Sequence, residues 1–247
     1  MVPGPSGPRR SAIATPLIRY TKACSEAAKI DWVRELGRGG RPITIRVFEN
    51  GFLERVLGQA HPITPILWFG APIAYGVWAG LVGPGVAITL GLFALGLLLW
   101  TLLEYVLHRV LFHFEAKSDA SRFRLFMMHG YHHLYPDDPM RLVAPPLMSW
   151  PLAILIGGLY RGALGPELFW PLLSGTMLGY LAYDWIHYYT HHFRPTGIVG
   201  KFLRRHHMVH HFKTPDANFG ISTPLWDFVF GTYRPHEPNA STASAEV

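Results

Sequence analysis

Two long stretches of the chain are almost continuously apolar, and each is interrupted once by a segment that contains glycine and proline. The first covers 66–107, carries Glu104 as its only charged residue and is divided by Gly-Pro-Gly at 83–85. The second covers 142–189 and is divided by "YRGALGPE" at 160–167. A helix that crosses a membrane needs about 20 apolar residues. The pattern therefore predicts four membrane-crossing helices, at about 65–82, 86–107, 143–160 and 168–189.

The more polar flanking segments divide the chain into three regions. Residues 1–60 begin with "MVPGPSGPRR", which is typical of a flexible terminus, and continue into an amphipathic segment. We expect this segment to lie along the membrane surface or against the cytosolic part of the protein. Residues 61–235 form the membrane domain, and 236–247 form a flexible tail. The predicted fold class is an all-α integral membrane bundle of four transmembrane helices with a cytosolic helical cap.

Composition supports a membrane protein and narrows the possible chemistry. Hydrophobic residues make up 49% of the chain and charged residues only 15%, against roughly 25% charged residues in soluble domains. The net charge is +6, but the basic residues flank the apolar stretches, so they do not indicate nucleic-acid binding. The single cysteine, Cys24, excludes an internal disulfide and a thiolate metal cluster.

The distribution of lysine and arginine predicts the orientation of the helices. Ten of these residues lie in 1–65, five in 108–142 and six in 190–247, whereas the connections within the two helix pairs hold none and one. Because cytosolic loops carry the excess of basic residues, we expect both termini and the middle segment in the cytosol. The protein would then be a multi-pass protein of a bacterial inner membrane or of the endoplasmic reticulum.

Histidines gather at the cytosolic ends of the predicted helices, where ten of the fourteen fall into four short clusters. These are His108 and His113; His129, His132 and His133; His187 and His191; and His207, His210 and His211. Residues three or four apart share one face of a helix, so each of the last three clusters can point one way. His108 and His113 would lie about 140° apart on an ideal helix. That spacing requires either a distortion such as a π-bulge or two different metal ions.

So many imidazoles close together predict a metal site. Neutral buried rings need hydrogen-bond partners and protonated rings repel one another, and a bound cation removes both problems. A single zinc site takes roughly three or four protein ligands, so the histidines suggest two ions with about five nitrogen ligands each. Imidazole suits iron, zinc and copper, and the ligand type alone does not choose between these metals.

Two acidic residues lie within the predicted helices, close to histidines. Glu104 precedes His108 by four residues and Asp184 precedes His187 by three, so each carboxylate shares a helix face with an imidazole. Metal-bound histidines commonly donate their second ring N–H to a carboxylate. We therefore expect Asp184 and Glu104 to orient these two histidines.

Four stretches of the chain resemble the integral-membrane fatty acid hydroxylase and sterol desaturase superfamily: "WTLLEYVLHRVLFHF", "HGYHHLYPDDPMRLVAPP", "YDWIHYYTHH" and "HHMVHHFKTPDANFGISTPLWDFVFGT". The resemblance covers about 100–230 and is strongest to the fatty acid 2-hydroxylases, in which "FGIST-LWD" follows the last cluster. It implies two iron ions bound by the ten histidines, with no catalytic side chain separate from these ligands. It also implies insertion of oxygen from O2 at the 2-position of an acyl chain. The substrate would be a bilayer lipid, either a free fatty acid or the N-acyl chain of a ceramide or other sphingolipid.

The implied chemistry agrees with iron and requires a source of electrons. Breaking an unactivated C–H bond needs a strong oxidant, and zinc has no redox chemistry, so zinc would only be a substitute in a purified sample. Eukaryotic members of the subfamily carry a fused cytochrome b5 domain, whereas the residues before 65 lack its His-Pro-Gly-Gly signature. We therefore expect an external donor, a separate cytochrome b5-like or ferredoxin-like protein.

The residues leave other functions to be tested. A sterol or carotenoid hydroxylase, or a lipid desaturase, of the same superfamily would share the histidine pattern. A metal transporter would need ligands on both sides of the membrane, whereas the clusters here are confined to one side. A zinc-dependent membrane hydrolase would work without O2 or a reductant.

Overall fold

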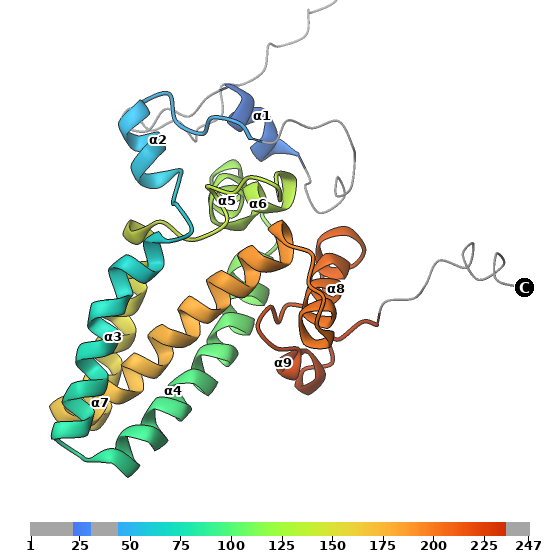
Figure 1. Ribbon diagram of the computed structural model, residues 1–247. Coiled ribbons are helices and arrows are strands. Elements are labelled where there is room, and N and C mark those ends of the chain that lie inside the picture. Colours follow the sequence, from blue (N-terminus) through green and yellow to red (C-terminus); the bar gives the residue numbers. More distant parts are fainter. Residues whose placement is uncertain (1–21, 31–43, 236–247) are drawn as a thin grey trace, which may run out of the picture.

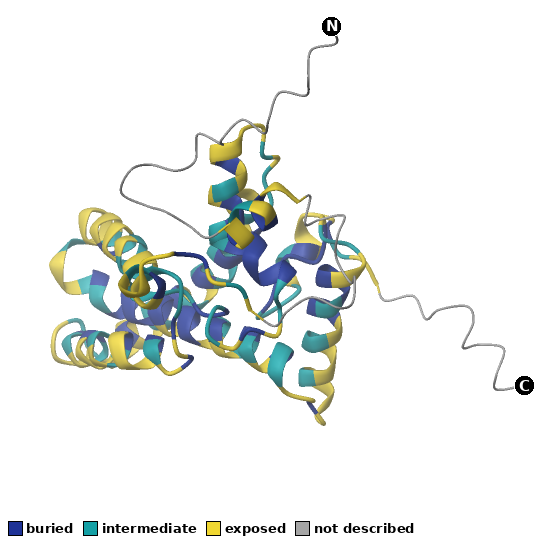
Figure 2. Ribbon diagram, turned by 90° about the horizontal axis from the view of Figure 1, so that it is seen from above, coloured by how far each residue is buried: buried dark blue, intermediate teal, exposed yellow. Residues whose placement is uncertain are grey.

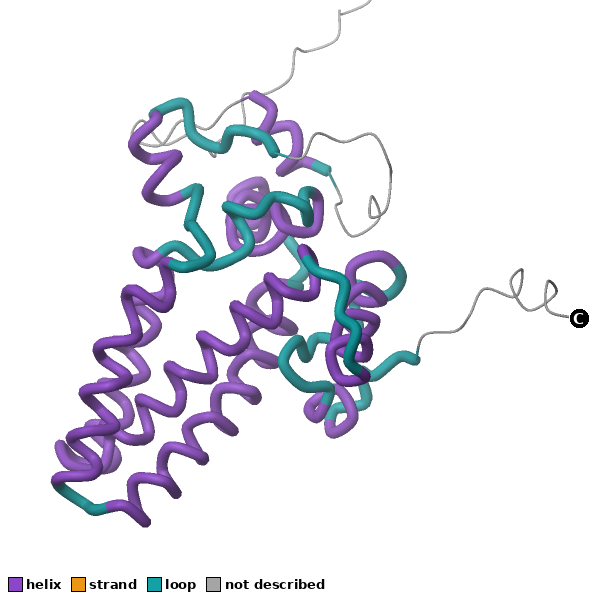
Figure 3. Tube along the Cα trace, viewed as in Figure 1, coloured by secondary structure: helices purple, strands orange, loops and turns teal. Residues whose placement is uncertain are grey.

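The structure is a computed structural model that describes residues 22–30 and 44–235. The flexible start and the flexible tail at 236–247 predicted from the sequence lie outside the described residues. Within these residues every regular element is a helix and no β-strand is present (Figure 3), which confirms the all-α class. In chain order the elements are α1 (Lys22–Lys29), α2 (Gly51–Leu57), α3 (Thr64–Val82), α4 (Val86–Val106), η1 (Leu107–Phe112), α5 (Asp119–Leu125), η2 (Phe126–Gly130), α6 (Tyr131–Leu134), α7 (Pro146–His192), α8 (Ile198–Phe212) and α9 (Leu225–Val229).

Helices α3, α4 and α7 form a long bundle at one end of the molecule (Figure 1). Each of the three is long and apolar enough to cross a membrane, α4 together with its continuation η1. Helix α3 carries Pro65 in its first turn, where the missing N–H has no helical partner to lose. It ends before Gly83, and Gly85 takes a φ of +89° in the connection to α4. Such a positive φ favours glycine, so this connection permits the sharp reversal between α3 and α4.

Helix α7 contains 47 residues but is not straight. At Gly165 the backbone takes φ +81° and ψ 177°, which interrupts the helix. The hydroxyl of Tyr160 lies 3.3 Å from the hydroxyl of Thr176, although 16 residues of straight helix would span about 24 Å. The chain therefore folds back at Gly165 into a first half and a second half that pack together (Figure 1). The reversal falls inside the connection predicted at 160–167.

The second half of α7 packs in the centre of the bundle. Gly175 lets it approach α4 closely, because a Cβ at this position would lie 2.1 Å from the carbonyl oxygen of Phe93. The ring of Tyr180 contacts the rings of Phe69 and Trp100, with centroids 5.3 Å apart in both pairs. The outer faces of the bundle are exposed (Figure 2) and largely apolar, which suits contact with lipid.

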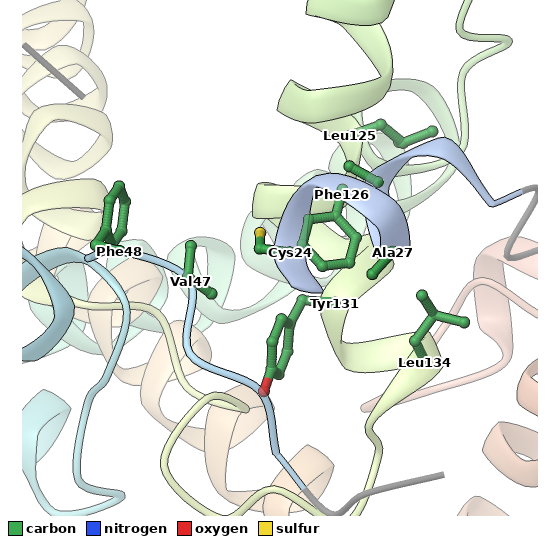
Figure 4. Packing of buried hydrophobic residues seen from close by; sticks show 9 residues of the cluster. Cys24, Ala27, Val47, Phe48, Leu125, Phe126, Tyr131 and Leu134 are labelled. Carbon is green, nitrogen blue, oxygen red and sulfur yellow. The ribbon is translucent and has the colours of Figure 1, made fainter. Parts of the chain in front are cut away.

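A short helical layer, here called the cap and made of α5, η2 and α6, lies at one end of the bundle (Figure 1). The described parts of the N-terminal segment pack on it (Figure 4). The buried cluster between them contains Cys24, Ala27, Ala28, Val47, Phe48, Leu125, Phe126, Tyr131 and Leu134. The Tyr131 hydroxyl accepts a hydrogen bond from the backbone N–H of Ile45 at 2.9 Å and lies 3.0 Å from the Asp138 carboxylate. These contacts fasten residues 44–48 to the cap.

Candidate metal centre

All ten histidines singled out in the sequence converge where the bundle meets the cap and α8, and they form two groups of five. Within each group, one ring nitrogen of every residue lies within 4.8 Å of the others. The first group consists of His108, His113, His129, His133 and His210, and the second of His132, His187, His191, His207 and His211. The groups adjoin, because the rings of His133 and His211 stack with their centroids 4.2 Å apart.

A π-helix brings the first two histidines of the first group together. His108 lies in η1 and His113 follows its last residue, so both belong to the distorted end of the α4 rod. The i→i+5 hydrogen bonding of a π-helix brings residues five apart towards one face, and the two ring centroids are 4.9 Å apart. Of the two alternatives for the H-x4-H pair, the helix distortion is confirmed, and both rings belong to the same group.

The two H-x-x-H-H clusters are each divided between the groups. His133 belongs to the first group and His132 to the second, and His210 and His211 are separated in the same way. The expectation that each cluster points one way is therefore wrong. Neighbouring residues on a helix point about 100° apart, so a cluster placed between two sites contributes to both.

The spacing of the ring nitrogens fits a bound cation in each group. Nε2 of His129 lies 2.9 Å from Nε2 of both His108 and His133. Nε2 of His132 likewise faces two other Nε2 atoms, at 2.9 and 3.0 Å. A neutral imidazole has a single N–H, so hydrogen bonds between rings cannot satisfy all these nitrogens at once. A cation shared by each group would satisfy them, because every ring could present a lone pair to it.

Backbone carbonyls orient two rings of the first group. Nδ1 of His108 lies 2.6 Å from the carbonyl oxygen of Phe219, and Nδ1 of His210 lies 2.7 Å from that of Ala217. A proton on each Nδ1 leaves the Nε2 lone pair free to bind a metal. Asn218, between the two carbonyls, has φ +57°, a left-handed conformation in which asparagine is enriched. The loop therefore turns so that both carbonyls reach histidines.

Two buried carboxylates hold this loop in place. Glu104 accepts hydrogen bonds from the backbone N–H groups of Ile221, at 2.6 Å, and Ser222, at 2.8 Å. Asp227 accepts from the backbone N–H groups of Phe219 and Gly220, both at 2.8 Å. Glu104 thus supports His108 through the loop, whereas the sequence predicted direct contact between the two side chains. The physical reason is that the loop offers two aligned N–H donors to the carboxylate.

Asp184 is buried beside His187 but is not hydrogen-bonded to it. Within the part of the chain that the structure describes, neither Oδ2 of Asp184 nor Nδ1 of His187 has a hydrogen-bond partner. The hydrogen bond that the spacing of the two residues predicted is therefore absent from this structure. Asp184 instead lines a cavity at the edge of the second group.

Three further histidines of the described chain, which were not among the predicted ligands, lie outside both groups. His206 lies 3.1 Å from Asp227 and is buried. His192 packs on the ring of Tyr188, with centroids 4.4 Å apart, and His61 accepts a hydrogen bond from a backbone N–H in its own turn. His236 lies outside the described residues.

Burial keeps the histidines neutral. Loss of water around the ring lowers the pKa of His129, His207 and His211 well below the usual value for histidine, and nearby rings lower it further. Protonated rings at this distance would repel one another in a medium with little water. At neutral pH these residues therefore offer lone pairs, the form that binds metals.

An apolar cavity of about 300 Å³ opens from the histidines into the bundle. His129, His132 and His187 line it where the two groups lie. Its lining continues along the second half of α7 as far as Leu173, which precedes His187 by 14 residues, or about 21 Å of helix. On the first half of α7, the lining reaches Ile156. The cavity therefore extends from the histidines into the apolar interior of the bundle.

The family assignment comes from comparison with known proteins. Residues 93–232 match the fatty acid hydroxylase family. The chain belongs to the fatty acid hydroxylase family. This agrees with the resemblance predicted from the histidine clusters, and it identifies the protein as an oxidoreductase of the hydroxylase type.

Individual relatives of this fatty acid hydroxylase are similar over most of its length. It is 36% identical to the dihydroceramide fatty acyl 2-hydroxylase FAH1 of Arabidopsis thaliana over 189 residues, which are 76% of this chain and 79% of that protein. It is 42% identical to the fatty acid 2-hydroxylase of Homo sapiens over 162 residues, 62% of this chain and 42% of that protein. A solved structure described as full-length Scs7p, with only the hydroxylase domain visible, matches with a TM-score of 0.72 and 30% identity. The match covers 85% of this chain and 82% of that chain.

Several residues that support the candidate metal centre of this hydroxylase could not be identified from the sequence, because their residue type does not indicate their role. The carbonyls of Ala217 and Phe219 act through the backbone, which any residue supplies. Asp227 and His206 pair with each other outside the histidine groups. The sequence pointed to this region through the stretch "FGIST-LWD". Its first residue, Phe219, provides the carbonyl that accepts the hydrogen bond from His108, and its aspartate, Asp227, binds the backbone N–H of Phe219.

Proposed function

We propose that this fatty acid hydroxylase is a membrane di-iron monooxygenase that hydroxylates C2 of a fatty acyl chain. One observation carries the proposal: two adjoining groups of five imidazoles, eight of the ten buried, meet a long apolar cavity. The names of the relatives, which are fatty acid and ceramide hydroxylases, support the same reaction.

We assign the ten histidines as the ligands of two iron ions, five to each. Bound iron would supply the oxidising power to replace the C2–H bond by C2–OH, with one oxygen atom of O2 entering the product and the other leaving as water after uptake of two electrons and two protons. Zinc, which has no redox chemistry, would occupy the same ligands without supporting the reaction. His108 and His210 hold fixed positions through the carbonyls of Phe219 and Ala217, and Glu104 binds the loop that carries these carbonyls.

The cavity would hold the acyl chain and limit its length. One extended residue spans about 3.5 Å over three backbone bonds. An extended chain of single bonds therefore advances about 1.2 Å per bond. The span of about 21 Å from His187 to Leu173 then accommodates about 17 bonds. Because the reacting carbon must lie beside the histidines, the ω-end of the chain reaches Leu173. The enzyme would position one C–H bond by anchoring both ends of the substrate.

The protein's own charges around the cavity offer a hydrogen-bond acceptor to an amide or a hydroxyl. Among the described residues that line it, Arg141 is the only cation, since the histidines are neutral. Its guanidinium forms ion pairs with Glu54 and, at 3.2 Å, with Asp138. The other charged lining residues, Glu104 and Asp184, are acidic. Among the protein's own side chains a carboxylate would find no unpaired positive charge, so only the proposed iron ions would attract it, whereas an amide N–H or a hydroxyl could donate to Asp184.

We further propose that the protein crosses the membrane four times, because α7 folds back at Gly165 and each half is at least as long as α3. The histidines, the cap and α8 would face the cytosol, in line with the excess of basic residues in 1–65, 108–142 and 190–247. Residues 61–235 would form the membrane domain, with the cap and the N-terminal segment over it. The electrons would come from a separate donor, a cytochrome b5-like or ferredoxin-like protein.

Expression in a host that lacks 2-hydroxylated lipids tests the function directly. Mass spectrometry of total lipid should show a gain of 16 mass units located at C2 of amide-linked acyl chains, dependent on O2. A loss of two hydrogens would indicate a desaturase, and the same gain on a sterol or carotenoid would indicate the alternative hydroxylase. Product formation without O2 or reductant would support a hydrolase and refute the proposal. The matched control is His187→Ala, which should give no product.

A further inference from the structure

Helix α9, in the segment after the last long helix, exposes an apolar face. Its exposed residues Leu225, Phe228 and Val229 are 43%, 59% and 59% accessible, and Phe230, which ends the helix, is 48% accessible. The only charged residue of the helix, Asp227, is fully buried. Four adjacent large apolar side chains without a charge between them are unusual on a face that meets water.

Contacts with α4 set the depth of this face in the membrane. Trp226 donates a hydrogen bond from its indole N–H to the hydroxyl of Thr101 at 2.9 Å, and Phe230 stacks on Tyr105 with centroids 5.1 Å apart. The rod from Val86 to Phe112 has 27 residues, or about 40 Å, whereas the hydrocarbon core is about 30 Å thick and takes about 20 residues. If the hydrocarbon core of the bilayer begins at the level of Val86, it ends near the level of residue 106. Thr101 then lies about 7.5 Å inside it.

We propose that α9 and Phe230 lie in the cytosolic face of the bilayer, with their exposed side chains among the lipid acyl chains. A depth of about 5–10 Å is typical of interfacial helices. The apolar face of α9 is continuous with the lipid-facing flank of α4, where Leu98 and Val106 are also exposed. Arg109, exposed one turn beyond Val106, lies at the level expected for headgroups. This inference rests on α4 crossing the bilayer and does not depend on the reaction.

The position of α9 matters because the helix carries Asp227. This carboxylate binds the backbone of Phe219 and Gly220 and lies 3.1 Å from His206. Phe219 in turn accepts the hydrogen bond from His108. The proposed lipid contact of α9 therefore lies directly beside the loop that orients His108.

Fluorescence of single labelled cysteines measures this depth without any activity assay. In a Cys24→Ala background, which removes the only cysteine, Val229→Cys is labelled with the environment-sensitive dye NBD and reconstituted in phosphatidylcholine vesicles. Leu98→Cys, deep on α4, and Ala120→Cys, exposed on the cap, are the positive and negative controls. Lipids that carry a doxyl quencher at carbon 5 or carbon 12 of the acyl chain report the depth.

We expect NBD at Val229 to be quenched several-fold more strongly than NBD at Ala120, and more by the carbon-5 quencher than by the carbon-12 quencher. Quenching and emission like those of Ala120 would overturn the proposal. A blue-shifted emission without lipid quenching, together with cross-links between Val229→Cys chains, would also overturn it and show a second copy on this face. Phe228→Cys, on the same face, repeats the measurement if Val229→Cys does not yield folded protein.

Discussion

Glu104 binds Ser222 twice, through its backbone N–H at 2.8 Å and through its hydroxyl, although the two residues are 118 positions apart. The contact joins the end of α4 to the loop that follows α8. Since the neighbouring Phe219 carbonyl accepts a hydrogen bond from His108, one buried carboxylate fixes both the loop and the orientation of a histidine. Glu104 would thus support the candidate metal centre without being one of its ligands.

Glu104→Gln should therefore weaken the site without abolishing the fold. The amide has one acceptor oxygen in place of two, so one of the three donors from Ile221 and Ser222 loses its partner. Loss of such support typically costs about 10- to 100-fold in metal affinity or activity. Metal titration of the purified variant measures the effect. Glu115→Gln, at an exposed position, is the control, and equal affinities of the two variants would contradict the role of Glu104.

Alanine variants of His132, His187 and His210 test the ligand assignment. Each should lose all activity and bind less metal, because each removes one nitrogen from a group of five. Metal content of the purified protein, measured by mass spectrometry, gives the stoichiometry. His61→Ala, outside both groups, should keep full metal content and activity. Unchanged stoichiometry in all three variants would refute the assignment.

Asp184→Asn tests the buried carboxylate at the edge of the second group. We expect a partial loss of about 10- to 100-fold in activity or metal affinity, the range found when a group next to metal ligands is changed. A loss in kcat/KM with unchanged metal affinity would place its role at the substrate, as its position in the cavity wall suggests. Asp216→Asn, exposed on the loop after α8, is the control. Full activity of Asp184→Asn would rule out both roles.

Ala153→Phe should shorten the acyl chain that the enzyme accepts. Ala153 lines the cavity on the first half of α7, and a phenyl ring there would take space from the substrate tail. We expect the product profile to move to acyl chains shorter by several carbons, with the shortest substrates least affected. Analysis of products from a mixture of chain lengths detects the change. Ala163→Phe, exposed on the same half, should leave the profile unchanged, and an unchanged profile in Ala153→Phe would place the tail elsewhere.

Acidification should destabilise the metal-free protein. Burial lowers the pKa of His129, His207 and His211 far below the value of about 6.5 in an unfolded chain. Below pH 6.5 the unfolded state therefore binds more protons than the folded state, and the free energy of unfolding falls as the pH falls. Each ring contributes at most about 1.4 kcal/mol per pH unit. Thermal unfolding in detergent at pH 7.5 and pH 5 measures this, and equal melting temperatures would show that the rings are not buried without metal.

The sequence by itself determined the helical class, the two apolar stretches and the ten histidines of the site. These features depend on local chemistry: apolar runs of sufficient length form membrane helices, and the residue type and short spacing of the histidines can be read from the chain itself. The glycines at 83–85 and 165 marked the reversals because they permit backbone conformations that other residues avoid. The family resemblance added the reaction, which residue spacing alone did not give.

Only the tertiary structure decided how the histidines are divided and what holds them. His132 and His133 are neighbours in the chain but belong to different groups, and Glu104 turned out to bind a loop more than a hundred residues away. The depth of α9 likewise follows from its contacts with α4. Spacing along a chain describes only a few turns of helix, whereas these relationships arise where distant elements pack. The loop after α8 takes its shape from hydrogen bonds to buried carboxylates, and no local pattern specifies such partners.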